Sequence, residues 1–230
     1  MTGIDAAHGR HIGIAPSILT ADFGRLAEQI RDAEAGGADL FHLDIMDGQF
    51  VPQLSFGPSI VEAVRKATSL PIEVHMMVAR PSEHFESFAQ AGAQTLVFHL
   101  EADGKPHAHI EAIHRLGLLA GIAINPGTPV AAVASLLPTL DEVIVMLVHP
   151  GRGGQEMIVE HLDKVVQLRA ITATLDRAVV LEVDGGVKTH NASACVAAGV
   201  DQFVAGSAVY NASETPQQAL AGLRAALAAG

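Results

Sequence analysis

Short apolar runs rich in Ile, Val and Leu alternate along the chain with longer stretches of helical periodicity, and turn residues separate the two. Eight apolar runs predict strands, at residues 12–19, 40–46, 72–78, 95–100, 119–125, 142–149, 179–184 and 202–209. Eight stretches predict helices, at residues 22–36, 58–69, 82–92, 107–117, 130–138, 157–176, 190–199 and 214–229. Strand and helix therefore alternate along almost the whole chain.

This alternation predicts an α/β fold, and the number of units predicts its architecture. Eight strand–helix units in 230 residues match a (β/α)8 TIM barrel, which typically has about 250 residues. The rival is a doubly wound open sheet that binds dinucleotides, which would carry G-x-G-x-x-G after the first strand; residues 16–20 read PSILT instead. We expect a single barrel domain over residues 1–230, with residues 1–11 as a loose tail.

One uncharged stretch, residues 116–140, is long enough on charge alone to suggest a membrane span. Residues 125–129 read NPGTP and break it near the middle, and Pro138 breaks it again. It therefore predicts a buried strand, a turn and a short helix, and we expect no membrane partner.

Composition and charge narrow the class of protein. Hydrophobic residues make up 49% of the chain and charged residues 17%, which is typical of neither disorder nor a coiled coil. The 25 Asp and Glu outnumber the 14 Lys and Arg, for a formal charge of −11, and no basic run offers a surface for nucleic acid. The single Cys195 cannot form an intramolecular disulfide, and residues 1–13 lack the apolar segment of a signal peptide. We expect a cytoplasmic protein.

Ionisable side chains interrupt three of the predicted strands. Alternation along a strand puts His42 and Asp44 on one face of the run at 40–46, and His75 on the same face of the next run as Glu73. Asp184 ends the seventh run. Because the carboxyl ends of barrel strands meet at one mouth, we expect His42, Asp44, His75 and Asp184 to converge there.

Two imidazoles and two carboxylates suit a borderline divalent ion such as Zn²⁺, Fe²⁺, Mn²⁺ or Co²⁺. A single buried His is more often a core residue satisfied by hydrogen bonds, but four ligand-type residues late on three strands favour a metal. A cation also keeps two buried carboxylates ionised. Glu73 and Glu182 lie one layer deeper, and they fit equally well as residues that orient the ligands and as a buried hydrogen-bond network.

Glycines follow the last three predicted strands, where barrels frequently bind a substrate phosphate through backbone amides. They are Gly151, Gly153 and Gly154, then Gly185 and Gly186, then Gly206 beside Ser207. One glycine turn is usually only a tight turn, but three at neighbouring strand ends favour an anion site. The methionines near strand ends, Met46, Met77 and Met146, are more often core residues than substrate contacts.

Several motifs together resemble the ribulose-phosphate 3-epimerase family. They are PSIL at 16–19, H-x-D-x-M-D-G-x-F-V-P at 42–52, H-x-M-V at 75–78, NPGTP at 125–129, VDGG at 183–186 and AGSA at 205–208. The resemblance runs from about residue 12 to residue 210. It implies a metal-dependent barrel that interconverts D-ribulose 5-phosphate and D-xylulose 5-phosphate, with Asp44 and Asp184 as the acid and base. It also implies that His42, Asp44, His75 and Asp184 hold the metal.

On this hypothesis the two facing carboxylates exchange a proton with carbon 3 of a ketose phosphate through an enediolate. We expect the substrate to contact Ser17, Met46, His75, Met77, Met146, Gly151, Gly153, Gly154, Gly185, Gly186, Gly206 and Ser207. We also expect a homo-oligomer.

The chain departs from the family pattern at the rim of the predicted mouth. The family usually reads V-N-P-G-F-G-G-Q after the sixth strand, where residues 148–155 read VHPGRGGQ, so His149 and Arg152 are candidate specificity residues. Gln49 and Gln53 stand where the family commonly has His and Asn. A related ketose phosphate, such as D-allulose 6-phosphate, is therefore an alternative substrate.

Two other functions on the same barrel are weaker alternatives. A phosphate-binding decarboxylase would typically carry D-x-K-x-x-D at a strand end, but the run from Asp44 to Asp47 has no lysine. A non-catalytic sugar-phosphate sensor would have lost ligands or an acid, and all four residues are present.

Overall fold

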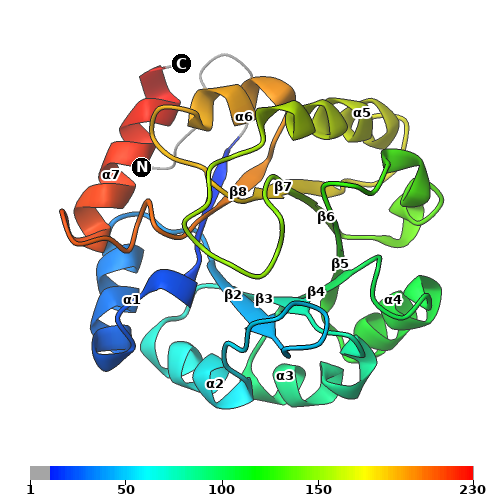
Figure 1. Cartoon of the computed structure of the whole chain (residues 1–230), viewed down its shortest axis with the longest axis horizontal. Coiled ribbons are helices and arrows are strands. Elements are labelled where there is room, and N and C mark those ends of the chain that lie inside the picture. The colour runs from blue at the N-terminus through cyan, green and yellow to red at the C-terminus, as the bar shows by residue number, and fades with distance from the viewer. Residues whose placement is uncertain (1–10, 230) are drawn as a thin grey trace.

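The computed structural model describes residues 11–229 and contains one sheet of eight parallel strands arranged in a ring (Figure 1). The strands are β1 (Gly13–Pro16), β2 (Phe41–Met46), β3 (Ile72–Met77), β4 (Thr95–His99), β5 (Leu119–Ile124), β6 (Glu142–Met146), β7 (Val180–Asp184) and β8 (Gln202–Ala205). Their order is β1-β8-β7-β6-β5-β4-β3-β2. A parallel bridge between Ser17 and His42 joins the two ends of the sheet. The predicted (β/α)8 barrel is confirmed.

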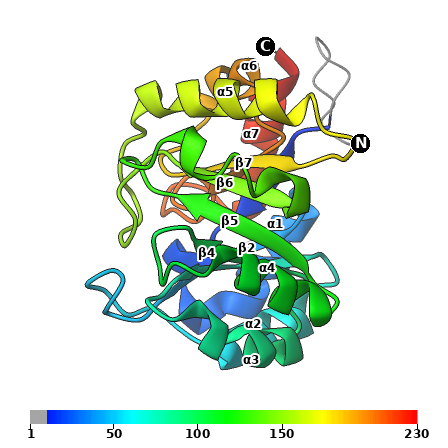
Figure 2. The same ribbon diagram turned by 90° about the vertical axis from the view of Figure 1, so that its right-hand side faces the viewer.

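Helices surround the strands on the outside, as Figure 1 shows. They are α1 (Leu26–Ala35), α2 (Pro58–Ala67), α3 (Phe85–Ala91), α4 (Pro106–Arg115), α5 (Leu162–Thr172), α6 (Ala192–Ala198) and α7 (Pro216–Ala229). The side view shows that the long loops after β2 and β6 project from the same end of the barrel (Figure 2). We call this end, where the strands finish, the mouth.

The predicted helix at 130–138 is wrong. The structure has two 3₁₀ turns there, Val130–Ala132 and Leu137–Thr139. The backbone N–H of Leu136 donates to the carbonyl of Val133 at 2.9 Å, which is an i to i+3 bond. Pro138 has no N–H to donate to the preceding turn, so an α-helix cannot run through it. Among the described residues, no helix has the length and apolar character needed to cross a bilayer.

Three predicted strands are shorter in the structure because the chain turns at the mouth. The first strand ends at Pro16 and gives way to a 3₁₀ turn over Ile18–Thr20, while β6 ends at Met146 and β8 at Ala205. Residues 1–10 of the expected tail lie outside the described residues. His11 is described, and its Nε2 lies 2.8 Å from Oδ1 of Asp39.

The main core lies between the sheet and the helices, and it contains the strand residues that point outward, such as Leu43, Val74 and Val183. The barrel interior differs from one side to the other. On β4, β5 and β6 it contains an apolar cluster of Val97, Ala123, Ile144 and Met146, beside two buried polar residues, His99 on β4 and Glu142 on β6. On β2, β3 and β7 the buried side chains that alternate with the outward ones are His, Asp and Glu. Polar residues are therefore concentrated on β2, β3 and β7.

The opposite end of the barrel carries a repeated contact. A residue one or two positions before each even-numbered strand accepts a hydrogen bond through its side chain, at 2.6–2.9 Å, from a backbone N–H near the start of the preceding odd-numbered strand. The four acceptors are Asp39, Gln94, Asp141 and Asp201. An arginine donates to each of them, and these are Arg224, Arg65, Arg177 and Arg169. We call these eight residues the lower rim.

Candidate functional site

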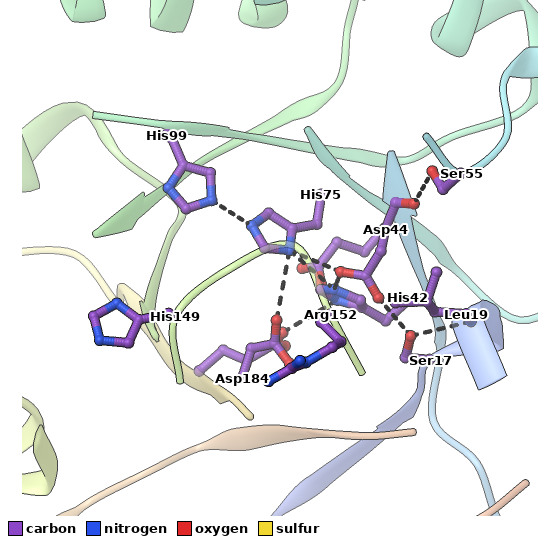
Figure 3. Close-up of polar contacts among 12 residues, drawn as sticks. Ser17, Leu19, His42, Asp44, Ser55, His75, His99, His149, Arg152 and Asp184 are labelled. Atoms are coloured by element: carbon purple, nitrogen blue, oxygen red, sulfur yellow. Dashed lines mark hydrogen bonds and ion pairs between the residues drawn. The ribbon is translucent and has the colours of Figure 1, made fainter. Parts of the chain in front are cut away.

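Four ionisable side chains from three strands meet inside the mouth (Figure 3). His42 and Asp44 come from β2, His75 from β3 and Asp184 from β7. His75 Nδ1 lies 3.1 Å from Asp44 Oδ1, 3.3 Å from His42 Nε2 and 3.6 Å from Asp184 Oδ2. His42 Nε2 lies 3.2 Å from Asp44 Oδ1. The four residues expected to converge are therefore together, and we call them the mouth cluster.

These spacings fit a divalent metal ion. Tetrahedral ligands at about 2.0–2.1 Å from an ion are separated from one another by about 3.3 Å. The four distances within the mouth cluster, 3.1, 3.2, 3.3 and 3.6 Å, bracket that value. The two ring nitrogens, His42 Nε2 and His75 Nδ1, face each other, so both lone pairs cannot be accommodated without a proton or a cation between them.

The charges of the mouth cluster also favour a cation. Burial raises the pKa of Asp184 to about 6, with a further contribution from the Asp44 carboxylate beside it. Burial raises the pKa of Asp44 as well, but His42 and His75 outweigh this effect and hold it well below its usual range. Burial lowers the pKa of His42, yet Asp44 and the neighbouring glutamates raise it well above its usual value. Without an ion, the cluster therefore gains a proton on His42.

Two serines hold Asp44 in place. The Ser17 hydroxyl donates to Asp44 Oδ2 at 2.5 Å, and Ser17 is buried. The Ser55 hydroxyl donates to the carbonyl of Asp44 at 2.6 Å and accepts from the backbone N–H of Met46 at 2.9 Å. Ser17 is one of the predicted substrate contacts, and Ser55 is not among the residues predicted from the sequence. In the structure Ser17 both lines the pocket and orients Asp44.

A layer of glutamates lies below the mouth cluster. His42 Nδ1 is 2.6 Å from Glu73 Oε1, so this nitrogen carries the proton and Nε2 is left to face the cluster. A spacing of 2.6 Å indicates a hydrogen bond rather than two ligands of a second ion. Gln202 donates to Glu182 and, at 3.2 Å, to Glu142. Of the two interpretations left open, Glu73 fits the orienting role and Glu182 fits the hydrogen-bond network.

The titration behaviour of these glutamates follows their partners. Burial raises the pKa of Glu73, but its bond to His42 outweighs burial and lowers the pKa to about 2. Burial and the charge of Glu73 raise the pKa of Glu182 to about 8. Glu142, which the sequence analysis did not select, also has a pKa well above its usual value because of burial and its two acidic neighbours. Glu73 is therefore ionised at neutral pH, while Glu182 and Glu142 are protonated.

A pocket opens above the mouth cluster and contains most of the residues expected to contact substrate. Its lining includes Ser17, Asp44, Met46, Met77, Met146, Gly151, Arg152, Gly153, Gly154, Asp184, Gly185, Gly186, Gly206 and Ser207. His42 and His75 are fully buried beneath it and are not part of the lining. His149 is exposed and points away from the cluster in Figure 3, so the structure does not bring it into the site.

Two adjacent glycines after β7 are required by close backbone packing. Gly185 has φ of +122° and Gly186 has φ of +69°, a region that side chains rarely adopt. A Cβ on Gly186 would lie 2.3 Å from the backbone nitrogen of Met157, and one on Gly185 would lie 2.5 Å from Val148. The tight-turn interpretation therefore holds for both glycines, and both also line the pocket.

The loop after β6 crosses the mouth, and its yellow-green trace lies over the centre of the barrel in Figure 1. The Gln155 side-chain amide donates to the carbonyls of His149 at 2.8 Å and Arg152 at 2.7 Å, which folds the loop onto itself. Arg152 is exposed and lines the pocket, so this residue lies at the entrance. Gln155 lines the pocket too, and the sequence analysis did not select it.

The sequence analysis also missed His99 and Glu101. His99 ends β4 and lies 2.9 Å from His75, Nε2 to Nε2, and its Nδ1 is 3.3 Å from Glu101 Oε2. The signal was present, because His99 is an ionisable residue at the end of a predicted strand, as His42 and His75 are within theirs. The other missed residues are apolar or hydroxyl side chains of the pocket wall, including Leu19, Thr20, Val148 and Val187.

Comparison with known proteins supports the resemblance noted from the motifs. Residues 13–210 match the model of the ribulose-phosphate 3 epimerase family. Ribulose-phosphate 3-epimerase of Bacillus subtilis (strain 168) is 44% identical over 204 residues, which cover 88% of this chain and 94% of that protein. Ribulose-phosphate 3-epimerase 1 of Cupriavidus necator is 47% identical over 219 residues, or 93% of this chain and 91% of that protein.

Solved structures of lower identity share the fold. A crystal structure of 3-hexulose-6-phosphate synthase superposes with a TM-score of 0.69 at 21% identity, and covers 94% of this chain and 98% of its own. A structure named KGPDC from Streptococcus mutans has a TM-score of 0.72 at 15% identity, covering 94% and 97%. At this identity the likeness shows the barrel and nothing more. The family match over residues 13–210 and the relatives at 44% and 47% identity show more: the chain belongs to the ribulose-phosphate 3-epimerase family.

Proposed function

We propose that this protein epimerises a ketose phosphate at carbon 3 and interconverts D-ribulose 5-phosphate and D-xylulose 5-phosphate. The observation that carries the proposal is the pairing of Asp44 and Asp184 at the floor of one pocket, each beside an imidazole of the mouth cluster. Inversion of a carbon next to a carbonyl needs one group to remove a proton and another to deliver one to the opposite face. Two carboxyl groups at one site supply both.

The mouth cluster is proposed to hold one divalent ion through His42, Asp44, His75 and Asp184. The native ion is Zn²⁺, Fe²⁺, Mn²⁺ or Co²⁺, because two nitrogen and two oxygen ligands suit any of these. When bound, such an ion would stabilise the negative charge that develops on the substrate oxygens as the carbon acid loses its proton. The ligand spacings of 3.1–3.6 Å support this assignment.

The two carboxyl groups carry the proton transfer. Asp44 has the lower pKa of the pair and Asp184 the higher, and environments that separate two acids in this way suit one as base and one as acid. In one direction a carboxylate takes the carbon-3 proton, and the other carboxyl group gives its own proton to the opposite face. The reverse reaction exchanges the two roles. The transfer balances without a redox cofactor.

The rest of the pocket would position the substrate and exclude water. Gly185, Gly186, Gly206 and Ser207 are proposed to bind the phosphate through backbone amides, since they line the pocket at the ends of β7 and β8. Met46, Met77 and Met146 are buried in the wall of the same pocket and offer apolar surface to the planar intermediate. Fixing the phosphate and the reacting carbon together makes the proton transfer effectively intramolecular.

A related ketose phosphate such as D-allulose 6-phosphate is the second candidate substrate. The observation in its favour is Arg152 at the pocket entrance, a forked donor that suits phosphate or hydroxyl oxygens. The decarboxylase and sensor alternatives gain no support, because the solved structures of low identity share only the fold and all four residues of the mouth cluster are in place.

Assembly and location are further parts of the proposal. We propose a homo-oligomer, whose interface would cover exposed apolar side chains such as Leu54, which is 78% exposed, and Phe23, which is 45% exposed. Light scattering on the purified protein tests it, and a monomer at micromolar concentration would contradict it. A cytoplasmic location is supported by the single, buried and unpaired Cys195.

The experiment that tests the function is an assay of the purified protein against a panel of ketose phosphates, with metal analysis of the same sample. We expect stoichiometric divalent metal and the highest kcat/KM for D-ribulose 5-phosphate. Full activity after exhaustive chelation would contradict the metal assignment. Turnover of D-allulose 6-phosphate above that of D-ribulose 5-phosphate would replace the substrate and leave the chemistry in place.

A further inference from the structure

A third histidine lies against the mouth cluster without belonging to it. His99 is 1% exposed, and its ring lies edge to edge with that of His75, with centroids 5.0 Å apart and planes inclined by 27°. The two Nε2 atoms are 2.9 Å apart, a hydrogen-bond distance, and the dashed line in Figure 3 marks this contact. His99 therefore contacts the side of His75 that faces away from Asp44 and Asp184.

The ring nitrogen of His75 that faces the mouth cluster determines which nitrogen carries the proton in both histidines. Its Nδ1 faces the mouth cluster, so a ligand role requires the lone pair on Nδ1 and the proton on Nε2. His75 then donates to Nε2 of His99, which must accept. The proton of His99 is consequently on Nδ1, which lies 3.3 Å from Oε2 of Glu101. Each imidazole in this series has one possible tautomer.

Glu101 is a fixed acceptor at the end of the series. Its Oε1 accepts from the backbone N–H of Asn125 at 2.9 Å and from the Thr128 hydroxyl. Burial raises the pKa of Glu101, but the bonds from His99, Thr128 and the Asn125 amide outweigh it and lower the pKa to about 2. An ionised carboxylate can only accept, which agrees with the proton on Nδ1 of His99.

The loop after β5, whose Asn125 and Thr128 donate hydrogen bonds to Glu101, is itself anchored. The Lys164 ammonium on α5 donates to the backbone carbonyls of Asn125 at 3.0 Å, Pro126 at 2.7 Å and Thr128 at 2.8 Å. The hydrogen bonds that run from His75 through His99 to Glu101 therefore end at a loop that Lys164 ties to a helix outside the barrel. This anchoring makes Glu101 a rigid reference point for the two imidazoles.

The two ligand histidines are held in different ways. His42 donates directly to Glu73, at 2.6 Å, whereas His75 reaches a carboxylate only through His99. Outer partners of this kind fix the ring and tautomer of a metal-bound histidine and raise its basicity. Without His99, the buried Nε2–H of His75 would lose its acceptor.

We propose that His99 and Glu101 are positioning residues that fix the tautomer and ring orientation of His75 so that its Nδ1 faces the metal. This inference rests on the metal site of the proposed function. The competing explanation is packing, because the His99 ring also contacts Phe50 with centroids 4.7 Å apart. A phenylalanine in place of His99 keeps a ring and removes both hydrogen bonds, so it separates the two explanations.

The test compares His99→Phe and Glu101→Gln with a matched control, His109→Phe. His109 is another buried histidine paired with an acid, Nε2 to Asp103 Oδ1 at 2.6 Å, and it packs against Phe85 and Phe98 rather than the mouth cluster. Metal-free protein is titrated with Co²⁺ against a competing chelator, and the visible spectrum of the Co²⁺ form is recorded. Circular dichroism checks the fold of each variant.

We expect His99→Phe to weaken Co²⁺ binding by about 10- to 100-fold and to change the Co²⁺ spectrum. Glu101→Gln should weaken binding by at least about threefold, since the bond it alters is one step further away. His109→Phe should bind Co²⁺ as the wild type does. His99→Gln, whose amide oxygen can accept from His75, should recover part of the lost affinity.

Binding within twofold of the wild type in both His99→Phe and Glu101→Gln would overturn the proposal. If His99→Phe does not fold, Glu101→Gln decides alone. An equal loss in His109→Phe would also overturn it, because that result would assign the effect to general packing. Failure of the wild type itself to bind Co²⁺ would overturn the metal site of the proposed function, and the two failures are therefore distinguishable.

Discussion

The two ends of this barrel use the same residue types for different purposes. At the lower rim each aspartate is paired with an arginine, as in Asp141 with Arg177 at 2.5 Å and Asp201 with Arg169 at 2.5 Å. At the mouth, among the residues that the structure describes, the ion pairs of Asp44 and Asp184 are with histidines. The aspartates of the lower rim, where the strands begin, are therefore paired with arginines that are always charged. The aspartates of the mouth, where we expect the reaction, are paired with histidines that can gain or lose a proton.

This difference separates stability from reactivity. A lower-rim aspartate accepts from a strand N–H and from an arginine, so its charge is neutralised in the folded protein and its removal should cost stability. The two carboxyl groups of the mouth cluster repel each other, and Asp184 has a raised pKa as a result of burial and that repulsion. Removing a charge from the mouth should therefore cost activity and little stability.

The largest expected effect is loss of the metal from the mouth. The double substitution His42→Gln and His75→Gln removes both imidazole ligands, so we expect no stoichiometric metal and a fall in kcat/KM of at least about 10³-fold, given that a metal contributes several kcal/mol. Elemental analysis and steady-state kinetics measure it. The control is His114→Gln, a histidine outside the mouth cluster whose Nε2 bonds to Asp141 of the lower rim at 2.8 Å, and it should keep metal and activity. Stoichiometric metal in the double variant would contradict the assignment of the metal site to the mouth.

The second effect is the pH dependence of metal binding. Protons compete with the ion at His42, whose pKa is raised, and at Asp184, whose pKa is about 6. Because these protons bind only the metal-free form, affinity falls as pH falls, by about 10²-fold or more between pH 7.5 and 5.5. Titration of metal-free protein with Zn²⁺ in weak buffer should release about one proton per ion at pH 7.5 and more at pH 5.5. A release independent of pH would contradict the assignment.

The third effect concerns the lower rim. Arg224 donates to the carbonyls of Ile12 and Gly37 and to Asp39, so Arg224→Met should lower the free energy of unfolding by about 2 kcal/mol. Urea denaturation measures the change, and kcat/KM should stay within twofold of the wild type. The control is Arg115→Met, whose exposed pair with Glu111 spans 3.8 Å and should change stability by less than about 0.5 kcal/mol. A fall in kcat/KM without a loss of stability would contradict the division between the two ends.

The smallest expected effect is on substrate preference. If Arg152 contacts substrate from the pocket entrance, Arg152→Phe should shift the kcat/KM ratio between D-ribulose 5-phosphate and D-allulose 6-phosphate by several-fold. His149→Asn on the same loop is the control, because His149 does not line the pocket, and it should leave the ratio unchanged. An unchanged ratio in both variants would make Arg152 a solvated residue of the loop.

The sequence predicts the fold and the mouth cluster well because both depend on simple periodicity. Alternation along a strand places His42 and Asp44 inside the barrel, and the parallel sheet brings Asp184 to the same end. The helix at 130–138 fails although its hydrophobic spacing suits an α-helix; Pro138 explains why no helix continues through the end of the segment, and nothing in the sequence marks the 3₁₀ turn at Val130–Ala132.

The residues that escape prediction depend on contacts across the barrel. Whether Glu182 bonds to His42 or to Gln202 is decided by side-chain packing between strands, and strand periodicity alone carries no such information. His149 is adjacent to the pocket in sequence yet points away from it, because the loop after β6 folds on itself through Gln155. His99 was detectable as an ionisable residue at a strand end, but its partner His75 was visible only in three dimensions.

The most direct test of the central claim is hydrogen exchange at carbon 3 in D₂O by the Asp184→Asn variant, followed by NMR with each epimer as substrate. Asp44 remains on one face, so we expect one epimer to exchange its carbon-3 hydrogen for deuterium without inversion, while epimerisation falls by at least about 10²-fold. Asp184 is also a proposed ligand, so the assay is run with an excess of divalent ion, and circular dichroism and metal content of the same sample check the fold and the occupancy of the site. Epimerisation at a near wild-type rate by Asp184→Asn would contradict the account of two carboxyl groups acting on opposite faces.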